Sequence, residues 1–509
     1  MVSSVGQTNP AYDRNLYSWT LVRDSIEGES AVKSRGSFYL PMPAAMQRAE
    51  YAQNPSAVKG SGSSWRVQDD QIRNKLSRLT MDPNYDPNPA FSAYLMRAQF
   101  PELTSFILRG LMGLAMGDMP TVKLPKQMEY LMERATPTGM NLIELYAKAV
   151  VETLSTGRFT LLLNVVDGQI EYIPYVAENM INWKARRAMS SKATDAQFIV
   201  FEEWENDPDS FSHELTQKFQ VARDLGPSYA IETYERDQPE PTSVIVPSYK
   251  GKTLSYIPFV TTGSIVNGLN INPVPLYSIA SSSLQIYMRT ADLGNSEFLS
   301  CNPTLVMTGV DKDEAPQALG PNVVLTLPNE GAKVFYTETD TSALAHVSNH
   351  IDVLYERAVY FGAQLLDSSK KAAESAETTR LKQASSGATL TSVITNVARS
   401  FESALKMQAE WMGLDGSQIE FKPVTEFMAP ALTSQEQQAM VASWTQGAIS
   451  KFTLLDNFRR AGVLPAGSSV DEELTRISSE VPEHNESDSE NVSPTPSPQD
   501  ETEEHEDAD

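Results

Sequence analysis

The sequence predicts an α+β protein built from several parts, and three observations support this fold class. Apolar residues recur every three or four positions over 275–300, 341–366 and 390–412, which is the spacing of amphipathic helices. Shorter alternating runs separated by turn residues lie between positions 158 and 261 and are typical of β-strands. The last segment, 471–509, is acidic and poor in apolar residues, so we expect it to be disordered.

Composition narrows the class of protein further. A chain of 509 residues is long enough for two or three domains, and its single cysteine, Cys301, excludes a disulfide within the chain. The N-terminus lacks the basic-then-apolar order of a secretory signal. The apolar stretch 106–119 is interrupted by charge and shorter than the roughly 20 residues of a membrane span. We therefore expect a soluble intracellular product that does not contact membranes.

The negative charge is concentrated at the C-terminal end. Residues 480–509 contain twelve acidic side chains and no Lys or Arg, which is half of the net charge of −24. The rest of the chain is still acidic, whereas a protein that grips nucleic acid tightly is normally basic. Any contact with DNA should therefore be loose or local.

The central segment predicts a helix, a strand-rich insert, a second helix, a charged loop and a third helix. The insert, 301–341, contains three candidate strands, at 304–307, 323–327 and 333–336. Each helix has one apolar stripe, and such a stripe has to be buried against another helix of the chain or against a second copy.

The remaining elements follow from local patterns. Helices are predicted over 18–26, 89–117 and 141–156, the last ended by Gly157. The dipeptide Asp167-Gly168 between two apolar runs predicts a β-hairpin over 158–175. Further strands are expected at 197–204, 218–223, 229–235, 243–246 and 257–261, and two more helices at 434–448 and 454–461.

No catalytic, metal or cofactor site is apparent in the sequence. His346 and His350 have the i, i+4 spacing of metal ligands, but no third ligand is suggested nearby, so ordinary surface or interface histidines are favoured. Cys301 lacks an activating context. The glycines at 110, 113 and 117 lack the lysine of a phosphate-binding loop, and close helix packing explains them better. The sequence therefore predicts a protein that is not an enzyme and needs no cofactor.

One basic cluster stands out in this acidic chain. Four cations lie in the predicted loop and the start of the third helix: Lys370, Lys371, Arg380 and Lys382. They fit a solvated helix face carrying Glu/Lys pairs. They also fit a small set of sequence-independent phosphate contacts, and both interpretations remain open.

The ordered set of elements resembles the portal (head–tail connector) proteins of tailed bacteriophages, and is most similar to an uncharacterised portal-like family. The resemblance spans about 15–465 and no single motif in it is highly specific. It rests on Trp19 to Asp24, Val32-Lys33, Gly36, Phe38 to Pro41, Tyr94, Arg97-Ala98, Phe100, Gly157-Arg158, Ile181 to Trp183, Ile257 to Phe259, Pro273 to Leu276, Asp292 and Asn302 to Thr304.

The resemblance implies a division of the chain. After an N-terminal polar region with one helix (1–89) we expect an α/β wing (90–273), a first stem helix (274–300), a small β-rich clip (301–341) and a second stem helix (342–366). A tunnel loop, about 367–378, and a long helix fill 367–432, a helical crown occupies 433–470, and the disordered acidic tail is 471–509.

The resemblance also implies a function. Portals form a homo-oligomeric ring, usually of twelve subunits, at one capsid vertex of the virion, assembled in the host cytoplasm. Double-stranded DNA is packaged and ejected through the centre, while terminase, the tail adaptor and the major capsid or scaffold protein bind the ring. Lys370, Lys371, Arg380 and Lys382 would then be weak DNA contacts.

Two other functions remain open from the sequence. The chain could be a minor capsid or scaffold-interacting structural protein without a DNA conduit. It could also be a hydrolase whose site is assembled from scattered residues. Observation of a closed ring would favour the channel protein over both of these alternatives.

Overall fold

The computed structural model divides into two compact units, Met1–Phe427 and Met428–Asp509, which are described separately. The structure describes residues 5–43, 89–186, 196–206, 215–236, 238–301, 304–309, 331–337, 342–366, 376–425, 434–460, 463–464 and 470–480. Helices and antiparallel strands are both abundant, so the predicted α+β class is confirmed.

A three-stranded sheet of order β3-β2-β9 lies at the centre of the first unit. Strands β2 (Arg158–Val166) and β3 (Gln169–Val176) form the predicted hairpin, and β9 (Phe259–Gly263) pairs with the other edge of β2. The turn residues Asp167 and Gly168 have φ of 52° and 79°. Two positive φ values are what a tight type I′ turn requires, so the hairpin prediction is confirmed.

A second, five-stranded sheet has the order β4-β5-β6-β7-β8. Four of its strands are predicted ones: β5 (Ala196–Asn206), β6 (Leu215–Asp224), β7 (Tyr229–Glu235) and β8 (Ser243–Ile245). Strand β4 (Met180–Ala185) was not predicted, and its pairing with β5 contains two register shifts. A short strand with an irregular register lacks a clean two-residue alternation, so the sequence pattern misses it.

Helix α7 (Leu142–Thr156) and the long helix α10 (Ala376–Met412) share the main core of the unit with the central sheet. In α7, Asn141 and Glu144 form a reciprocal capping box, and Gly157 ends the helix with φ of 72°. The prediction of this helix and its end is confirmed. Tyr146 of α7 meets Phe401 of α10 edge to face, with ring centroids 5.6 Å apart.

The N-terminal region is more ordered than predicted. Helix α1 runs over Pro10–Glu27 instead of 18–26, because Asn9 accepts a hydrogen bond from the Ala11 amide and Pro10 begins the helix. A short helix α2 (Glu29–Ser34) and a 3₁₀ turn, η1 (Gly36–Phe38), follow. Trp19 is fully buried, and its indole donates to the Thr156 carbonyl. The prediction of an irregular region with one helix is therefore wrong for 5–43.

The helical pattern over 89–117 forms two helices, α5 (Pro89–Arg97) and α6 (Leu103–Ala115). Pro101 lies in the gap, and a proline disfavours helical geometry at the residue before it. The Gln99 backbone in the gap exchanges two hydrogen bonds with the Thr290 hydroxyl instead.

A two-stranded sheet joins residues about 300 positions apart. Strand β1 (Thr121–Lys123) pairs antiparallel with β12 (Glu420–Lys422), and the 3₁₀ segments η2 (Lys126–Met132) and η4 (Gly416–Gln418) flank them. Neither strand was predicted, since three residues are too few for a periodic signal.

The second unit contains α11 (Ser434–Thr445), α12 (Lys451–Arg460) and α13 (Val470–Glu480). The first two agree with the predicted pair, but α13 lies where a disordered tail was expected, so that expectation is wrong for 471–480. Val470, Leu474 and Ile477 share one face of α13, and three acidic residues occupy its first turn. Both features favour a helix.

Arg158 carries a buried charge without an anionic partner. Its side chain is 1% exposed, and neither Nε nor Nη1 has a hydrogen-bond partner. Nη2 lies 3.1 Å from the Met180 sulfur, and the guanidinium stacks 4.0 Å from the Trp183 ring centroid. Desolvation lowers the pKa of Arg158 to about 9.

We expect Arg158→Met to leave the free energy of unfolding unchanged or to raise it by about 1–3 kcal/mol, because it removes an uncompensated buried charge. Arg134→Met is the contrasting variant. It should lower stability by about 2–3 kcal/mol, because Arg134 pairs at 3.0 Å with the buried Glu171 carboxylate. Urea denaturation measures both, and a larger loss for Arg158→Met than for Arg134→Met would contradict this account.

Gly157→Ala should be much more destabilising than Gly139→Ala. Both glycines have positive φ, so each alanine adds about 1–2 kcal/mol of backbone strain. At Gly157, however, a Cβ would lie 2.7 Å from the Pro273 carbonyl oxygen, whereas Gly139 faces open space. We expect a further loss of about 1–3 kcal/mol at Gly157. Urea denaturation measures both variants. Equal midpoints would contradict the prediction, because they would mean that the backbone at Pro273 moves away from the new Cβ without cost.

Candidate assembly surface on the projecting helix pair

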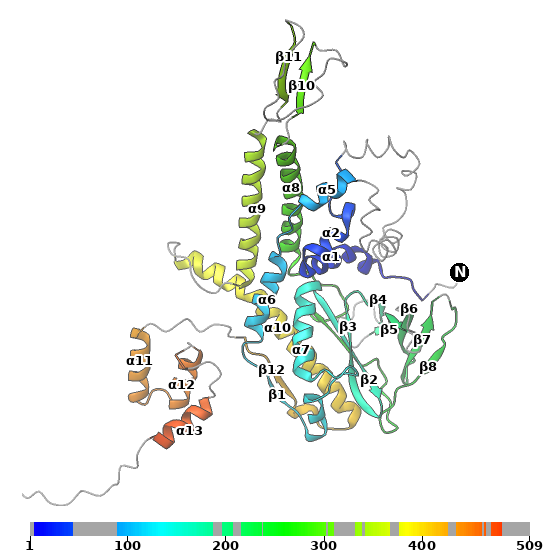
Figure 1. The fold of residues 1–509 in the computed structure, drawn as a ribbon. Helices are drawn as coiled ribbons and strands as arrows, with labels where there is room; N and C mark the ends of the chain where they lie inside the picture. Colours follow the sequence, from blue (N-terminus) through cyan, green and yellow to red (C-terminus); the bar gives the residue numbers. More distant parts are fainter. Residues whose placement is uncertain are drawn as a thin grey trace, which may run out of the picture. The chain divides into compact units, whose positions relative to one another are not determined.

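Two long helices project from the first unit with a β-hairpin at their far end (Figure 1). Helix α8 spans Tyr277–Cys301 and α9 spans Ser342–Leu366, close to the helices predicted over 275–300 and 341–366. Strands β10 (Thr304–Thr308) and β11 (Lys333–Thr337) pair antiparallel between them. The third predicted strand, 323–327, lies outside the described residues.

The first half of α8 is fixed in the main core. Its buried apolar residues there are Leu276 just before the helix, Ile279, Ala280, Leu284, Tyr287 and Ala291. Helix α5 holds the next turns: the Tyr94 hydroxyl donates to the Asp292 carboxylate at 2.6 Å, and the Arg97 guanidinium stacks on the Phe298 ring. Burial and this carboxylate together raise the pKa of Tyr94, so the phenol remains protonated.

A separate apolar seam joins α8 to α9. Ile286 of α8 is buried against Ile351 and Leu354 of α9, with Leu103, Leu293 and Val347 packed around them. Near the base, Gly362 of α9 allows close approach to α6, because a Cβ there would lie 2.3 Å from the Ile107 side chain. The seam uses one face of each helix, and the side chains of α9 that point away from it over 352–361 are exposed.

Helix α9 presents apolar side chains on two separate flanks. Val353 and Tyr360 share one flank, and Tyr355 and Val359 share the other; all four are exposed, Val359 by 55%. At about 100° per residue the two flanks lie roughly 130° apart around the helix. Neither flank overlaps the seam, because the seam residues Ile351 and Leu354 lie on the remaining side of the helix.

An acidic stripe separates the two apolar flanks. Asp352 and Glu356 are four residues apart, so they share one face, and Asn349 precedes them by one turn. All three are exposed. Helix α9 therefore carries four strips in order: the seam, an apolar flank, an acidic stripe and a second apolar flank.

The hairpin at the tip exposes two aromatic residues, Phe335 and Tyr336. Neighbouring residues of a strand point to opposite faces, so each face of the hairpin carries one of the rings. Val306 and Leu305 are their cross-strand partners. Two strands alone bury little apolar surface, so this hairpin is expected to gain stability from a partner.

The four predicted DNA contacts are only partly located. Lys370 and Lys371 lie outside the described residues. Arg380 and Lys382 lie in the first turns of α10, which begins at Ala376 and so takes in three residues of the tunnel loop predicted over 367–378. The assignment of these four side chains remains a prediction.

The other candidate sites have simple structural accounts. His346 and His350 are both exposed on α9, and no cluster of three or more His, Cys, Asp or Glu able to hold a metal occurs among the described residues. Gly110 and Gly113 lie on an exposed side of α6, and a Cβ at Gly113 would meet nothing within 4 Å. The prediction that close helix packing explains these glycines is therefore wrong within one chain. No described helix has the length and apolar character of a membrane span.

The segment that forms this surface matches a family model. The model is described as "Domain of unknown function (DUF4055)" and covers residues 275–412, from the start of α8 to the end of α10. No curated protein matches the chain.

Three solved structures are similar to the chain at low identity. A chain of the "Virion of native gene transfer agent (GTA) particle" is 14% identical, with a TM-score of 0.37, over 72% of this chain and 92% of that one. A chain of the neck of the native GTA particle, computed with C12 symmetry, is 13% identical with a TM-score of 0.35 over 72% and 92%. A chain of the neck of the empty particle, computed with C6 symmetry, is 15% identical with a TM-score of 0.34 over 74% and 94%.

Leu354→Ala and Val353→Ala should separate folding from assembly. Leu354 is 3% exposed in the seam, so its truncation should cost about 2–5 kcal/mol of stability. The adjacent Val353 is 40% exposed, so Val353→Ala should change the stability of the single chain by about 0.5 kcal/mol or less. Hydrogen exchange of α8 and α9 measures the difference, and equal protection in the two variants would contradict the assigned seam.

Proposed function

We propose that this chain is a portal-type head–tail connector, a structural subunit that assembles into a ring at one capsid vertex of a virion. Phage DNA is packaged and ejected through the ring, on which terminase and the tail adaptor bind. The observation that carries this proposal is the pair of apolar flanks on α9. The sequence resemblance supports it independently.

The two flanks favour a ring over a simple dimer. A two-fold dimer uses the same patch on both subunits, so one apolar flank would be enough. Two different flanks allow each subunit to contact one neighbour with Val353 and Tyr360 and another with Tyr355 and Val359. A contact of this head-to-tail kind generates closed rings when the rotation between subunits closes.

The acidic stripe supports a DNA conduit at the centre of that ring. If both flanks are covered by neighbours, Asp352 and Glu356 are left on the open side of α9. Repeated around a ring, these carboxylates repel phosphates and keep DNA from adhering to the wall. In this proposal, weak contacts with the DNA phosphates come from Lys370, Lys371, Arg380 and Lys382, and these contacts hold the DNA in place.

The elements fit the expected portal parts as follows. The two sheets form the wing with α6 and α7, helices α8 and α9 form the stem, and the β10–β11 hairpin forms the clip. Helix α10 is the long helix after the tunnel loop, and α11 with α12 forms the crown. Terminase and the tail adaptor bind on the clip side, where Phe335 and Tyr336 are exposed.

A minor capsid or scaffold-interacting protein without a conduit is the second candidate. It would also expose apolar surface, but it has no need for two distinct apolar flanks on one helix. The hydrolase alternative has no supporting observation among the described side chains.

The mass of the purified assembly tests the proposal. We expect a species near twelve times 56.2 kDa for the unmodified chain. Val359→Asp should give monomers or open fragments, because a charge buried in the flank contact is strongly unfavourable. Native mass spectrometry measures both proteins.

Ala345→Asp is the matched control for Val359→Asp, because the exposed Ala345 lies between Asp352 and Glu356 around the helix at about 100° per residue. It adds the same charge on the same helix, but in the acidic stripe, so the ring should persist. A monomeric unmodified chain would overturn the proposed function. A Val359→Asp ring of full size would instead remove the flanks from the interface.

Lys370→Ala with Lys371→Ala should reduce the amount of DNA retained in filled particles, most clearly at low salt. Each lost phosphate contact removes about 0.9 from the slope of log affinity against log salt concentration. Lys126→Ala with Lys184→Ala, two exposed lysines on η2 and β4, is the control. Normal packaging and retention in the Lys370/Lys371 variant would end the DNA-contact assignment.

A further inference from the structure

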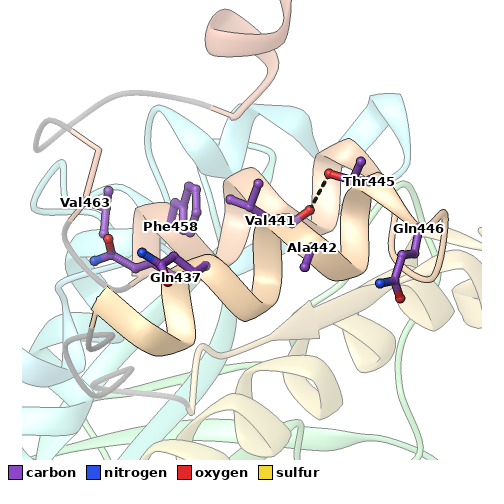
Figure 2. A pocket seen from close by; sticks show the side chains of 8 residues that line it. Gln437, Val441, Ala442, Thr445, Gln446, Phe458 and Val463 are labelled. Atoms are coloured by element: carbon purple, nitrogen blue, oxygen red, sulfur yellow. Dashed lines mark hydrogen bonds between the residues drawn. The ribbon is translucent and has the colours of Figure 1, made fainter. Parts of the chain in front are cut away.

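The second unit contains an apolar groove between helix α11 and the end of α12 (Figure 2). Its volume is about 670 Å³. Val441, Ala442, Phe458 and Val463 form the apolar part of the lining, and three glutamines with Thr445 form the rest. A groove of this size holds several rings or a helical turn of a partner.

The described part of this unit has a small apolar core. Of its described apolar side chains, Leu454, Leu455 and Val470 are buried. Val441, Trp444, Phe452 and Val463 are all exposed. Three short helices with so small a core are marginal alone, so covering the groove would contribute a large share of their stability.

The acidic end of the chain does not provide a suitable occupant. Residues 481–509 contain no aromatic residue, and their apolar residues are Val481, Val492 and Ala508. A segment of this composition cannot fill an apolar groove with a well-packed anchor.

The same unit carries an apolar projection on another side. Phe452 is 50% exposed at the first turn of α12. It lies six residues before Phe458, which places the two rings roughly 120° apart around the helix. Phe458 lines the groove, and Phe452 therefore points away from it.

Charge does not oppose the approach of a second copy at this place. The chain has a net charge of −24, so two copies repel each other at long range. The rim of the groove, however, contains the neutral amides of Gln437, Gln438 and Gln446. Lys451, next to Phe452, adds a cation to the projecting turn.

We propose that the first turn of α12, led by the Phe452 ring, inserts into the α11–α12 groove of a neighbouring copy. A projection and a complementary groove on different sides of one unit form a head-to-tail contact. In the proposed ring this contact is repeated from subunit to subunit. The inference rests on the proposed function, because only a closed ring repeats this contact around all subunits. It assigns a new contact surface, the α11–α12 groove and Phe452, in addition to the α8–α9 stem.

Disulfide trapping between two chains tests the contact. Full-length chains carrying Cys301→Ser are co-expressed, one with Phe452→Cys and the other with Ala442→Cys, and distinguished by tags of different mass. Mild oxidation should give a mixed disulfide dimer. Its yield should be about tenfold above that of a control pair in which Ser443→Cys replaces Ala442→Cys, the tenfold ratio corresponding to about 1.4 kcal/mol of preference. Ser443 lies on the opposite side of α11 from the groove at about 100° per residue.

The outcomes distinguish this inference from the proposed function. A ring of full mass with no more mixed disulfide than the control overturns the α12 contact and leaves the ring intact. The mixed disulfide in a chain whose stem does not form rings supports the contact and overturns the ring. Monomers without the disulfide overturn both. A Phe452→Ala variant that lowers the ring-to-subunit ratio would give independent support for the contact.

Discussion

The projecting part of this protein depends on one helix that is packed in two different environments. The first half of α8 is buried in the main core, and the second half is covered by α9 and by side chains of α5. The core fixes the direction of α8, and the Ile286 seam then fixes α9 against it. Because this seam and the close approach of Gly362 to α6 hold α9, its exposed sides are available for contacts between copies. The two apolar flanks and the acidic stripe are consequences of this arrangement.

The elements that the sequence predicts best are those determined by residues close together in the chain, such as turn residues and helix caps. The hairpin at Asp167-Gly168 and helix α7 with its Asn141 cap agree with prediction, because turn and cap chemistry act within a few residues. The long helices α8 and α9 agree because their apolar period continues over 25 residues each. In contrast, β1 and β12 pair over a long sequence separation, and nothing local marks three-residue strands.

The functional surface could be predicted only in outline. Apolar stripes on the long helices indicated that something has to cover them, but a stripe does not show how much of its surface the same chain covers. The division of α9 into a seam and two flanks depends on where Ile286 and α6 lie, which is tertiary information. The helix α13 was missed because the acidic composition of its surroundings outweighed the spacing of Val470, Leu474 and Ile477. The four basic residues were found from charge contrast alone, which says nothing of their position.

The junction of β1 with β12 has a mechanical consequence. This pair joins the chain before and after the whole α8–α9 segment, so both ends of that segment return to the same compact unit. A load applied along the axis at the hairpin therefore enters α8 and α9 together and is carried in shear by their side-chain contacts. Such a load does not break the β1–β12 hydrogen bonds one after another. Seam contacts in shear share a load among several residues, so the paired helices should resist bending more than either helix alone.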